Sequence, residues 1–133
     1  MNVIDRATED VLKELEATAD EFWNVSRVTG NFLNMLLKIS GSHRVLELGT
    51  SNGYSGIWLG MALREIGGTL TTIEFWDNRL EMAKTNFDKC GVADIITTTL
   101  ETIIHTNFFV NQRITIKEDI NIKFYSYKKF NAL

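Results

Sequence analysis

Apolar positions recur at helical spacing in the first forty residues of this 133-residue chain. Residues 8–22 are predicted to form an amphipathic helix, with charged side chains opposite its apolar face. That face consists of Val11, Leu12, Leu15, Ala19 and Phe22. A second helix is predicted to start at Thr29, a suitable N-cap, and to end at Gly41. Its inward positions are expected to be Phe32, Met35, Leu36 and Ile39.

In the middle of the chain, short apolar or β-branched runs alternate with helical patterns. The runs that predict strands lie at residues 44–48, 69–75 and 93–100. Helices are expected between them, from about Ser55 to Ile66 and from an Asp77 cap to Gly91. Strands and helices that alternate at this spacing predict βαβ units with parallel pairing and right-handed crossovers. The predicted fold class is therefore α/β, a Rossmann-like parallel sheet preceded by N-terminal helices.

The composition changes after the third predicted strand. All nine glycines lie at or before Gly91, whereas Ile, Asn, Lys, Phe and Tyr make up 20 of the 31 residues in 103–133. We expect residues 1–102 to form a domain whose sheet is incomplete after its third strand, and residues 103–133 to be an atypical tail. A changed reading frame or a premature end is one hypothesis for this tail. Within it, RITIK (113–117) and INIKF (120–124) alternate like a terminal hairpin or added edge strands.

Charge and composition exclude several classes of function. Residues 1–110 carry 9 Lys and Arg against 15 Asp and Glu, which makes them a poor surface for nucleic acid. No apolar run approaches the ~20 residues that cross a bilayer, and the acidic start is unlike a secretory signal, so the cytoplasm is the expected location. Cys90, His43 and His105 lack metal-ligand spacing, and no metal site is predicted.

The stretch VLELGTSNGYSG (45–56) carries the strongest chemical signal in the chain. A predicted strand runs into Gly49, the backbone turns tightly, and a helix begins near Ser55. Glycine lets a ligand approach the backbone closely, and free amide groups at a helix start favour an anionic group. Glu74 ends the next strand, where a carboxylate can accept hydrogen bonds from both hydroxyls of an adenosine ribose. These features predict a site for a nucleoside cofactor with a small anionic end.

Two side chains distinguish S-adenosylmethionine (SAM) from a dinucleotide as the cofactor. The dinucleotide pattern G-x-G-x-x-G is absent, because Ser51 stands where its second glycine would lie against the pyrophosphate. Glu47 would repel a pyrophosphate but suits a cationic amino acid that carries an ammonium and a sulfonium. We therefore predict SAM rather than NAD. A strand–glycine–helix turn that binds no ligand is the remaining alternative.

In these segments the chain resembles the cation-dependent O-methyltransferases, the class I methyltransferase family that contains the caffeoyl-CoA and catechol O-methyltransferases. The resemblance covers about residues 20–102. It rests on GNFLNMLLK (30–38), VLELGTSNGYS (45–55) and TTIEFWDNRLEMAKTNFDKCGV (71–92), in this order and spacing. It implies the fold of a class I methyltransferase and SAM as the cofactor.

The resemblance also implies roles for individual residues. Ser55 is expected to hold the methionine carboxylate, Glu47 to lie near the amino-acid end of SAM, and Glu74 to bind the ribose. Phe75 is expected against the adenine, with Trp76 as a rival for that contact. The full set of expected cofactor-binding residues is Val25, Glu47, Gly49, Ser51, Gly53, Tyr54, Ser55, Glu74 and Phe75.

The resemblance stops before the segments that act on the methyl acceptor. Complete relatives bind a divalent cation through acidic residues after the fourth and fifth strands, and no such pattern is recognisable after Glu101. The expected function is that of a SAM-dependent O-methyltransferase acting on the hydroxyl of a small molecule, with this chain retaining mainly the SAM-binding half. The alternative is a non-catalytic SAM-binding or interaction remnant. Because the family often forms dimers through its N-terminal helices, a homodimer is a further expectation.

Overall fold

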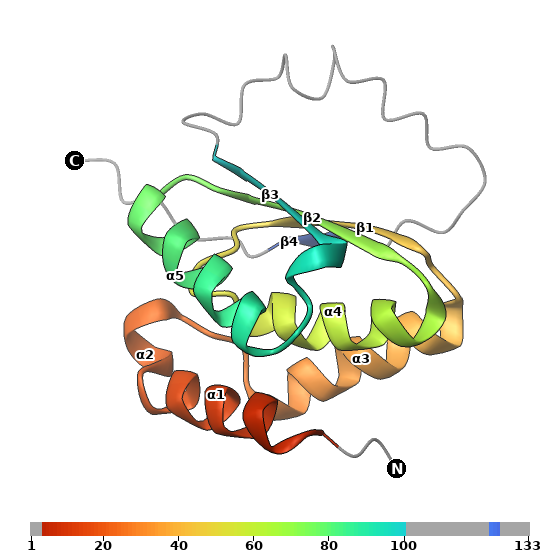
Figure 1. The fold of residues 1–133 in the computed structure, drawn as a ribbon, viewed down its shortest axis with the longest axis horizontal. Helices are drawn as coiled ribbons and strands as arrows, with labels where there is room; N and C mark the ends of the chain where they lie inside the picture. The colour runs from red at the N-terminus through yellow and green to blue at the C-terminus, as the bar shows by residue number, and fades with distance from the viewer. Residues whose placement is uncertain (1–3, 101–122, 126–133) are drawn as a thin grey trace.

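The computed structural model describes residues 4–100 and 123–125. Three helices come first: α1 (Arg6–Ala17), α2 (Ala19–Phe22) and α3 (Arg27–Ser40). The alternating part consists of β1 (Arg44–Leu48), α4 (Tyr54–Ile66), β2 (Thr69–Glu74), α5 (Asp77–Lys89), the 3₁₀ helix η1 (Ala93–Ile95) and β3 (Ile96–Leu100). A last strand, β4, spans Lys123–Tyr125 (Figure 1). The predicted succession of helices and strands is therefore confirmed up to β3.

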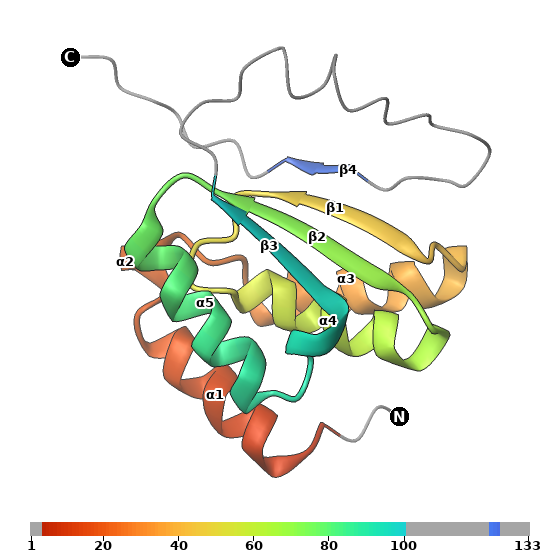
Figure 2. The same cartoon turned by 45° about the horizontal axis from the view of Figure 1, so that its top comes forward.

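The described strands form one parallel sheet in the order β3-β2-β1-β4. Helix α4 connects β1 to β2 and α5 connects β2 to β3, which are the predicted βαβ units. Figure 2 shows that the described helices lie on one face of this sheet. Strand β4 overlaps the segment predicted at 120–124 and pairs with β1, whereas the segment at 113–117 lies outside the described residues. The α/β Rossmann-like class is confirmed.

The predicted helix over residues 8–22 is wrong in its last turn, because the chain breaks at Thr18 between α1 and α2. Thr18 leaves the helical conformation (φ −116°, ψ 22°), and Trp23 ends α2 in the left-handed region at φ 53°. The Asn24 side-chain amide donates to the Leu15 carbonyl at 3.2 Å and so satisfies a carbonyl near the end of α1. The break turns residues 22–25 away from the axis of α1, toward the sheet end at which β1 stops.

The prediction for α3 is wrong in its cap and in its buried face. Ser26 is the N-cap, and its hydroxyl accepts a hydrogen bond from the Thr29 backbone amide at 3.1 Å. The buried positions are Gly30, Leu33, Asn34 and Leu37, whereas Phe32 and Ile39 are 58% and 79% exposed. Gly30 explains the difference, because a Cβ there would lie 2.4 Å from the Trp58 ring. Only this glycine-bearing side of α3 can approach α4 closely. The predicted end at Gly41 is confirmed.

Two smaller differences concern the second half of the sheet. Asp77 is the first residue of α5 rather than its cap; the cap position is Trp76, which makes no side-chain capping hydrogen bond. Residues 93–95 form a 3₁₀ turn, so the third strand starts at Ile96. The predicted close of α5 at Gly91 agrees with that residue's φ of 64°.

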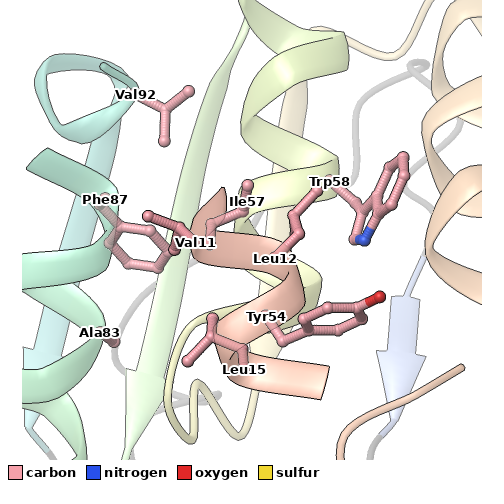
Figure 3. Packing of buried hydrophobic residues seen from close by; sticks show 9 residues of the cluster. All are labelled: Val11, Leu12, Leu15, Tyr54, Ile57, Trp58, Ala83, Phe87 and Val92. Carbon is pink, nitrogen blue, oxygen red and sulfur yellow. The ribbon is translucent and has the colours of Figure 1, made fainter. Parts of the chain in front are cut away.

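Helix α4 lies at the centre of the hydrophobic core. On one side, α1 and α5 pack against it through Val11, Leu12, Leu15, Tyr54, Ile57, Trp58, Ala83, Phe87 and Val92 (Figure 3). On the other side, α3 and the sheet pack against it through Leu33, Leu37, Val45, Leu59, Ala62, Leu63 and Leu70. This packing fixes the start of α4 beside the end of β1. None of the described helices is both long enough and apolar enough to cross a membrane.

Candidate functional site

The turn that joins β1 to α4 is strongly bent and tied to the neighbouring strand. Gly49 (φ 93°), Ser51 (φ 52°) and Gly53 (φ 89°) all have positive φ angles. The backbone amides of Gly49 and Thr50 both donate to the Ile73 carbonyl, at 2.8 and 3.2 Å. Helix α4 starts after Gly53 without a side-chain cap. The Tyr54 N–H donates to the Asn52 side-chain oxygen at 3.3 Å, so an anionic group would depend on the N–H groups that follow it in the first turn.

Glu47 is a buried carboxylate beside this turn. Its residue is only 4% exposed. The Ser55 hydroxyl donates to Oε1 at 2.5 Å, and the Thr72 hydroxyl donates to Oε2 at 2.6 Å. Thr72 is the Cα partner of Glu47 in the parallel pair β1–β2, so the sheet register brings the two side chains to the same face. Both oxygens of the carboxylate are thus hydrogen bonded to neutral hydroxyl groups.

The pKa of Glu47 is raised toward neutral pH. Burial raises the pKa of Glu47 from 4.5 to about 7 because the charged form loses its hydration. The hydrogen bonds from Ser55 and Thr72 act in the opposite direction, and the negative charge of Glu74 adds to the rise. Among the described residues, the ion pairs of lysine and arginine all involve other carboxylates. Glu47 therefore has hydroxyl partners but no cationic one in this part of the chain.

Glu74, at the end of β2, faces the turn and binds backbone amides. Its Oε2 accepts from the Ser51 N–H at 2.6 Å, and its Oε1 accepts from the Phe75 and Trp76 N–H groups at 2.9 and 3.0 Å. A carboxylate has about four lone-pair sites, so one is left for a further donor. Glu74 points toward the turn, which the predicted ribose contact requires.

A cavity of about 260 Å³ lies between this turn and the N-terminal helices. It is lined by Phe22, Trp23, Asn24, Val25, Thr29, Leu33, Glu47, Leu48, Gly49, Thr50, Ser51, Tyr54, Ser55 and Leu59. Its volume is slightly below the range of about 300–1,000 Å³ typical of small-molecule pockets. It is therefore suited to a part of a nucleoside cofactor, such as its amino-acid end.

Six of the nine predicted cofactor-binding residues line this cavity: Val25, Glu47, Gly49, Ser51, Tyr54 and Ser55. Gly53 lies behind the turn, where a Cβ would be 2.9 Å from the Phe87 ring. Glu74 lies outside the lining but contacts Ser51. Phe75 also lies outside it, 41% exposed, and contacts Trp76 edge to face at 4.9 Å between centroids. The two rival aromatic residues thus form one exposed pair next to Glu74.

Two predicted residues make contacts that the sequence did not indicate. The Ser55 hydroxyl proton is directed to Glu47, so an anion at the helix start would depend on backbone N–H groups. The Tyr54 ring lines the cavity while its hydroxyl donates to Glu16 of α1 at 2.6 Å. Burial, and then this hydrogen bond, raise the pKa of Tyr54 to about 12. Tyr54 therefore joins α1 to α4 as an uncharged donor.

Several residues of the site were not predicted. Thr50 and Thr72 share a hydroxyl hydrogen bond of 2.7 Å and support Glu47. Arg79 of α5 donates to the Ser51 hydroxyl at 3.3 Å, and its guanidinium carbon lies 5.2 Å from the centroid of the Phe22 ring. The strand register could have indicated Thr72, because it lies opposite Glu47. Nothing in the sequence pattern indicated Arg79. Within the described part of the chain, no three His, Cys, Asp or Glu residues are grouped so that they could bind a metal ion.

Comparison with known proteins agrees with this geometry. The sequence model of the family described as O-methyltransferase matches residues 4–119. Caffeoyl-CoA O-methyltransferase 1 of Zea mays is 33% identical over 95 residues, which are 69% of this chain and 36% of that protein. The resemblance inferred from the three sequence segments is thereby confirmed.

Solved structures give the same result. The O-methyltransferase from Bacillus cereus in complex with SAH has a TM-score of 0.62 and 33% identity, and the match covers 71% of this chain and 43% of that one. The O-methyltransferase TomG from Streptomyces achromogenes, in complex with SAM, has a TM-score of 0.60 and 32% identity, with 72% and 43% covered. The chain thus spans less than half the length of these relatives. By sequence and by fold, it belongs to the O-methyltransferase family.

Proposed function

We propose that the cavity beside the β1–α4 turn binds the amino-acid end of SAM. The observation that carries this proposal is Glu47, a buried carboxylate that lines the cavity with two hydroxyl partners and no cationic one among the described residues. A buried carboxylate that lacks a cation favours a cationic ligand, because desolvation is offset only when the charge is paired. The amino-acid end of SAM carries both an ammonium and a sulfonium. Relatives with the same fold were solved with SAH and with SAM.

The other parts of SAM fit the residues around this cavity. The methionine carboxylate would accept hydrogen bonds from backbone N–H groups at the start of α4. One ribose hydroxyl would donate to the remaining lone pair of Glu74, and the adenine would lie against the exposed pair Phe75–Trp76. Val25 would cover the cofactor from the segment that precedes α3. The nucleoside would then lie outside the cavity, which agrees with the limited cavity volume.

We propose methyl transfer to a hydroxyl group of a small molecule as the reaction of the protein. SAM supplies an activated methyl group, and the residues described above bind and orient it so that the acceptor can attack in line. The acceptor site and any divalent cation would depend on residues beyond those described. The relatives named for caffeoyl-CoA and catechol make a phenolic hydroxyl the first acceptor class to test. SAM binding without transfer is the second candidate, since the same cavity supports it.

Calorimetric titration with SAM and with SAH tests the binding proposal. We expect both ligands to bind to the wild-type protein and binding to weaken at least tenfold in Glu74→Gln, because the ribose loses a charged acceptor. Glu65→Gln is the matched control, since Glu65 is an exposed residue of α4 paired with Lys38. No binding at millimolar SAM would contradict the proposal. Transfer of a labelled methyl group to catechol, with and without Mg²⁺, distinguishes the enzyme from a SAM-binding protein.

A homodimer and a cytoplasmic location stay predictions. The side chains of Val28, Phe32, Met35 and Ile39 follow one another along α3 at helical spacing and are all exposed, so this face is the first in which to seek an interface. Light scattering after size exclusion would measure the mass in solution. A monomeric mass for the wild-type protein would contradict the dimer.

A further inference from the structure

The hydrogen-bond partners of Glu47 allow either of two charge states. The carboxyl group is hydrogen bonded to the hydroxyls of Ser55 and Thr72, and the Thr72 hydroxyl is in turn hydrogen bonded to that of Thr50. A hydroxyl can donate to a carboxylate or accept from a carboxylic acid. A partner such as arginine would allow the ionised state alone. The group also lines a cavity, so a ligand can reach it. Its charge can therefore change without any rearrangement of the surrounding strands.

Among the side chains that the structure describes, none of the charged groups on the elements around Glu47 forms an ion pair with it. On β2, Glu74 adds a second negative charge. On α4, the Tyr54 hydroxyl is directed to Glu16 of α1, which is paired in turn with Arg27 of α3. On α5, Arg79 interacts with Ser51 and Phe22. The remaining titratable group on α3, Lys38, is paired with Glu65.

Burial without a cation leaves two ways to neutralise this carboxylate: a proton or a positively charged ligand. On the basis of the SAM site proposed above, we propose that Glu47 carries a proton when the cavity lacks a cation and releases it to solvent when the ammonium group of the cofactor enters. The two cations compete for one carboxylate, so cofactor binding and protonation of Glu47 exclude each other. No covalent bond changes, and the proton passes from the carboxyl group to the buffer.

This exchange of a proton for the ammonium group at Glu47 predicts how cofactor binding depends on pH. A pKa of about 7 for Glu47 in the free protein makes SAM and SAH bind about tenfold more weakly at pH 6 than at pH 8. Each bound ligand therefore releases a larger fraction of a proton at pH 6.5, below this pKa, than at pH 8, above it. A nucleoside without the amino-acid end, such as 5′-methylthioadenosine, brings no ammonium and releases none.

Titration calorimetry in buffers of different ionisation enthalpy measures this proton directly. The full chain is titrated with SAH in phosphate and in Tris or imidazole at pH 6.5 and pH 8, and the slope of heat against buffer enthalpy gives the number of protons released. Glu47→Gln is expected to release none and to bind SAH with no pH dependence between 6 and 8. Glu65→Gln, a neutralised carboxylate outside the cavity, is expected to behave as the wild type does.

The outcomes separate this inference from the function on which it rests. SAH binding with no proton release at pH 6.5, or with full release in Glu47→Gln, would overturn the exchange and leave the SAM site intact. A buffer-dependent heat for 5′-methylthioadenosine would overturn it too, and this test needs no variant. The absence of SAM and SAH binding at both pH values would overturn the proposed function and the exchange together.

Discussion

Two glutamates end or nearly end adjacent strands, and their surroundings give them different properties. Glu47 receives two hydroxyl groups inside the protein, so its carboxyl group can be neutral near pH 7. Glu74 receives three backbone amides, one from the β1–α4 turn and two from the residues that follow β2. Backbone N–H groups can only donate, so this arrangement suits an ionised carboxylate. One residue type thus binds hydroxyl groups at one position of the site and backbone amides at the other.

The raised pKa of Glu47 makes stability depend on pH. The unfolded chain loses this proton near pH 4.5 and the folded chain near 7, so the folded state binds more protons between these values and its stability falls as pH rises through them. Relative to Glu47→Gln, we expect the wild type to lose about 2 to 3 kcal/mol of unfolding free energy from pH 5 to pH 8. Urea denaturation at both values measures the difference. Parallel losses in the two proteins would contradict it.

Packing against α5 requires glycine at position 53. Its φ of 89° disfavours any side chain, and a Cβ there would lie 2.9 Å from the Phe87 ring and 3.2 Å from the Ala83 backbone. Phe87 is 1% exposed and packs in the core. We expect Gly53→Ala to cost about 3 kcal/mol of unfolding free energy. Gly41→Ala is the control with a similar positive φ but no atom within 4 Å, and about 1 kcal/mol is expected. If thermal or urea unfolding shows that Gly53→Ala and Gly41→Ala lose the same unfolding free energy, the steric argument is refuted.

The residues predicted from the sequence are mainly those for which local spacing determines position. Gly49, Ser51 and Ser55 follow one strand directly, so the strand-to-helix turn brings them to one cavity. Thr72 depends on the strand register, and Arg79 depends on how α5 packs, and neither is encoded by spacing along the chain. The Ser55 hydroxyl points to Glu47 because it donates a hydrogen bond to that carboxyl group. The folded structure shows this contact, and the spacing of the two residues along the chain does not.

At the scale of elements, the described structure departs most from the pattern in the helices before β1. A stripe of apolar residues on α3 indicated an inward face at Phe32, Met35 and Ile39, yet these side chains are exposed. Hydrophobic periodicity identifies an apolar face but not what it packs against. Gly30 and Asn34 face α4 instead, because the first admits the Trp58 ring and the second donates to the Trp58 carbonyl at 2.9 Å. The strands were predicted better, since each is a short apolar or β-branched run that local composition identifies.

The segment from Phe22 to Val25 is held over the cavity by contacts from α5 and the turn. The Ser51 hydroxyl donates to the Phe22 carbonyl at 3.1 Å and accepts from Arg79, whose guanidinium lies against the Phe22 ring. We expect Arg79→Ala to weaken SAM binding about fivefold, the equivalent of about 1 kcal/mol, because the segment loses a cation–π contact and a hydrogen bond. Intrinsic tryptophan fluorescence during titration with SAM measures the dissociation constant. Arg6→Ala, on the exposed side of α1, is the control. An unchanged dissociation constant in Arg79→Ala would rule out this role.

At the scale of the molecule, strand β1 has a neighbour on each side. β2 pairs with it over five residues and β4 over three, with Leu46, Glu47 and Leu48 opposite Lys123, Phe124 and Tyr125. The sequence indicated an added edge strand in this region, and the structure shows that it runs parallel to β1. An exposed β1 edge would present unpaired backbone groups beside the proposed site, and such edges favour association with other chains. The three pairs with β4 cover the part of β1 that carries Glu47.

Removal of residues 120–133 tests whether β4 protects β1. In the full chain we expect the backbone amides of β1 to exchange as slowly as those of β2, because both strands are paired on two sides. Without β4, the amides of Leu46–Leu48 that it engages should exchange at least tenfold faster, while those of β2, still between β1 and β3, should change little. Hydrogen–deuterium exchange by mass spectrometry measures both strands in one experiment, so β2 is the internal control. Equal exchange of β1 in the two chains would mean that Lys123–Tyr125 contributes no protection. Since Glu47 lies in the protected part, a truncated chain that also loses SAH affinity would link the strand to the cavity.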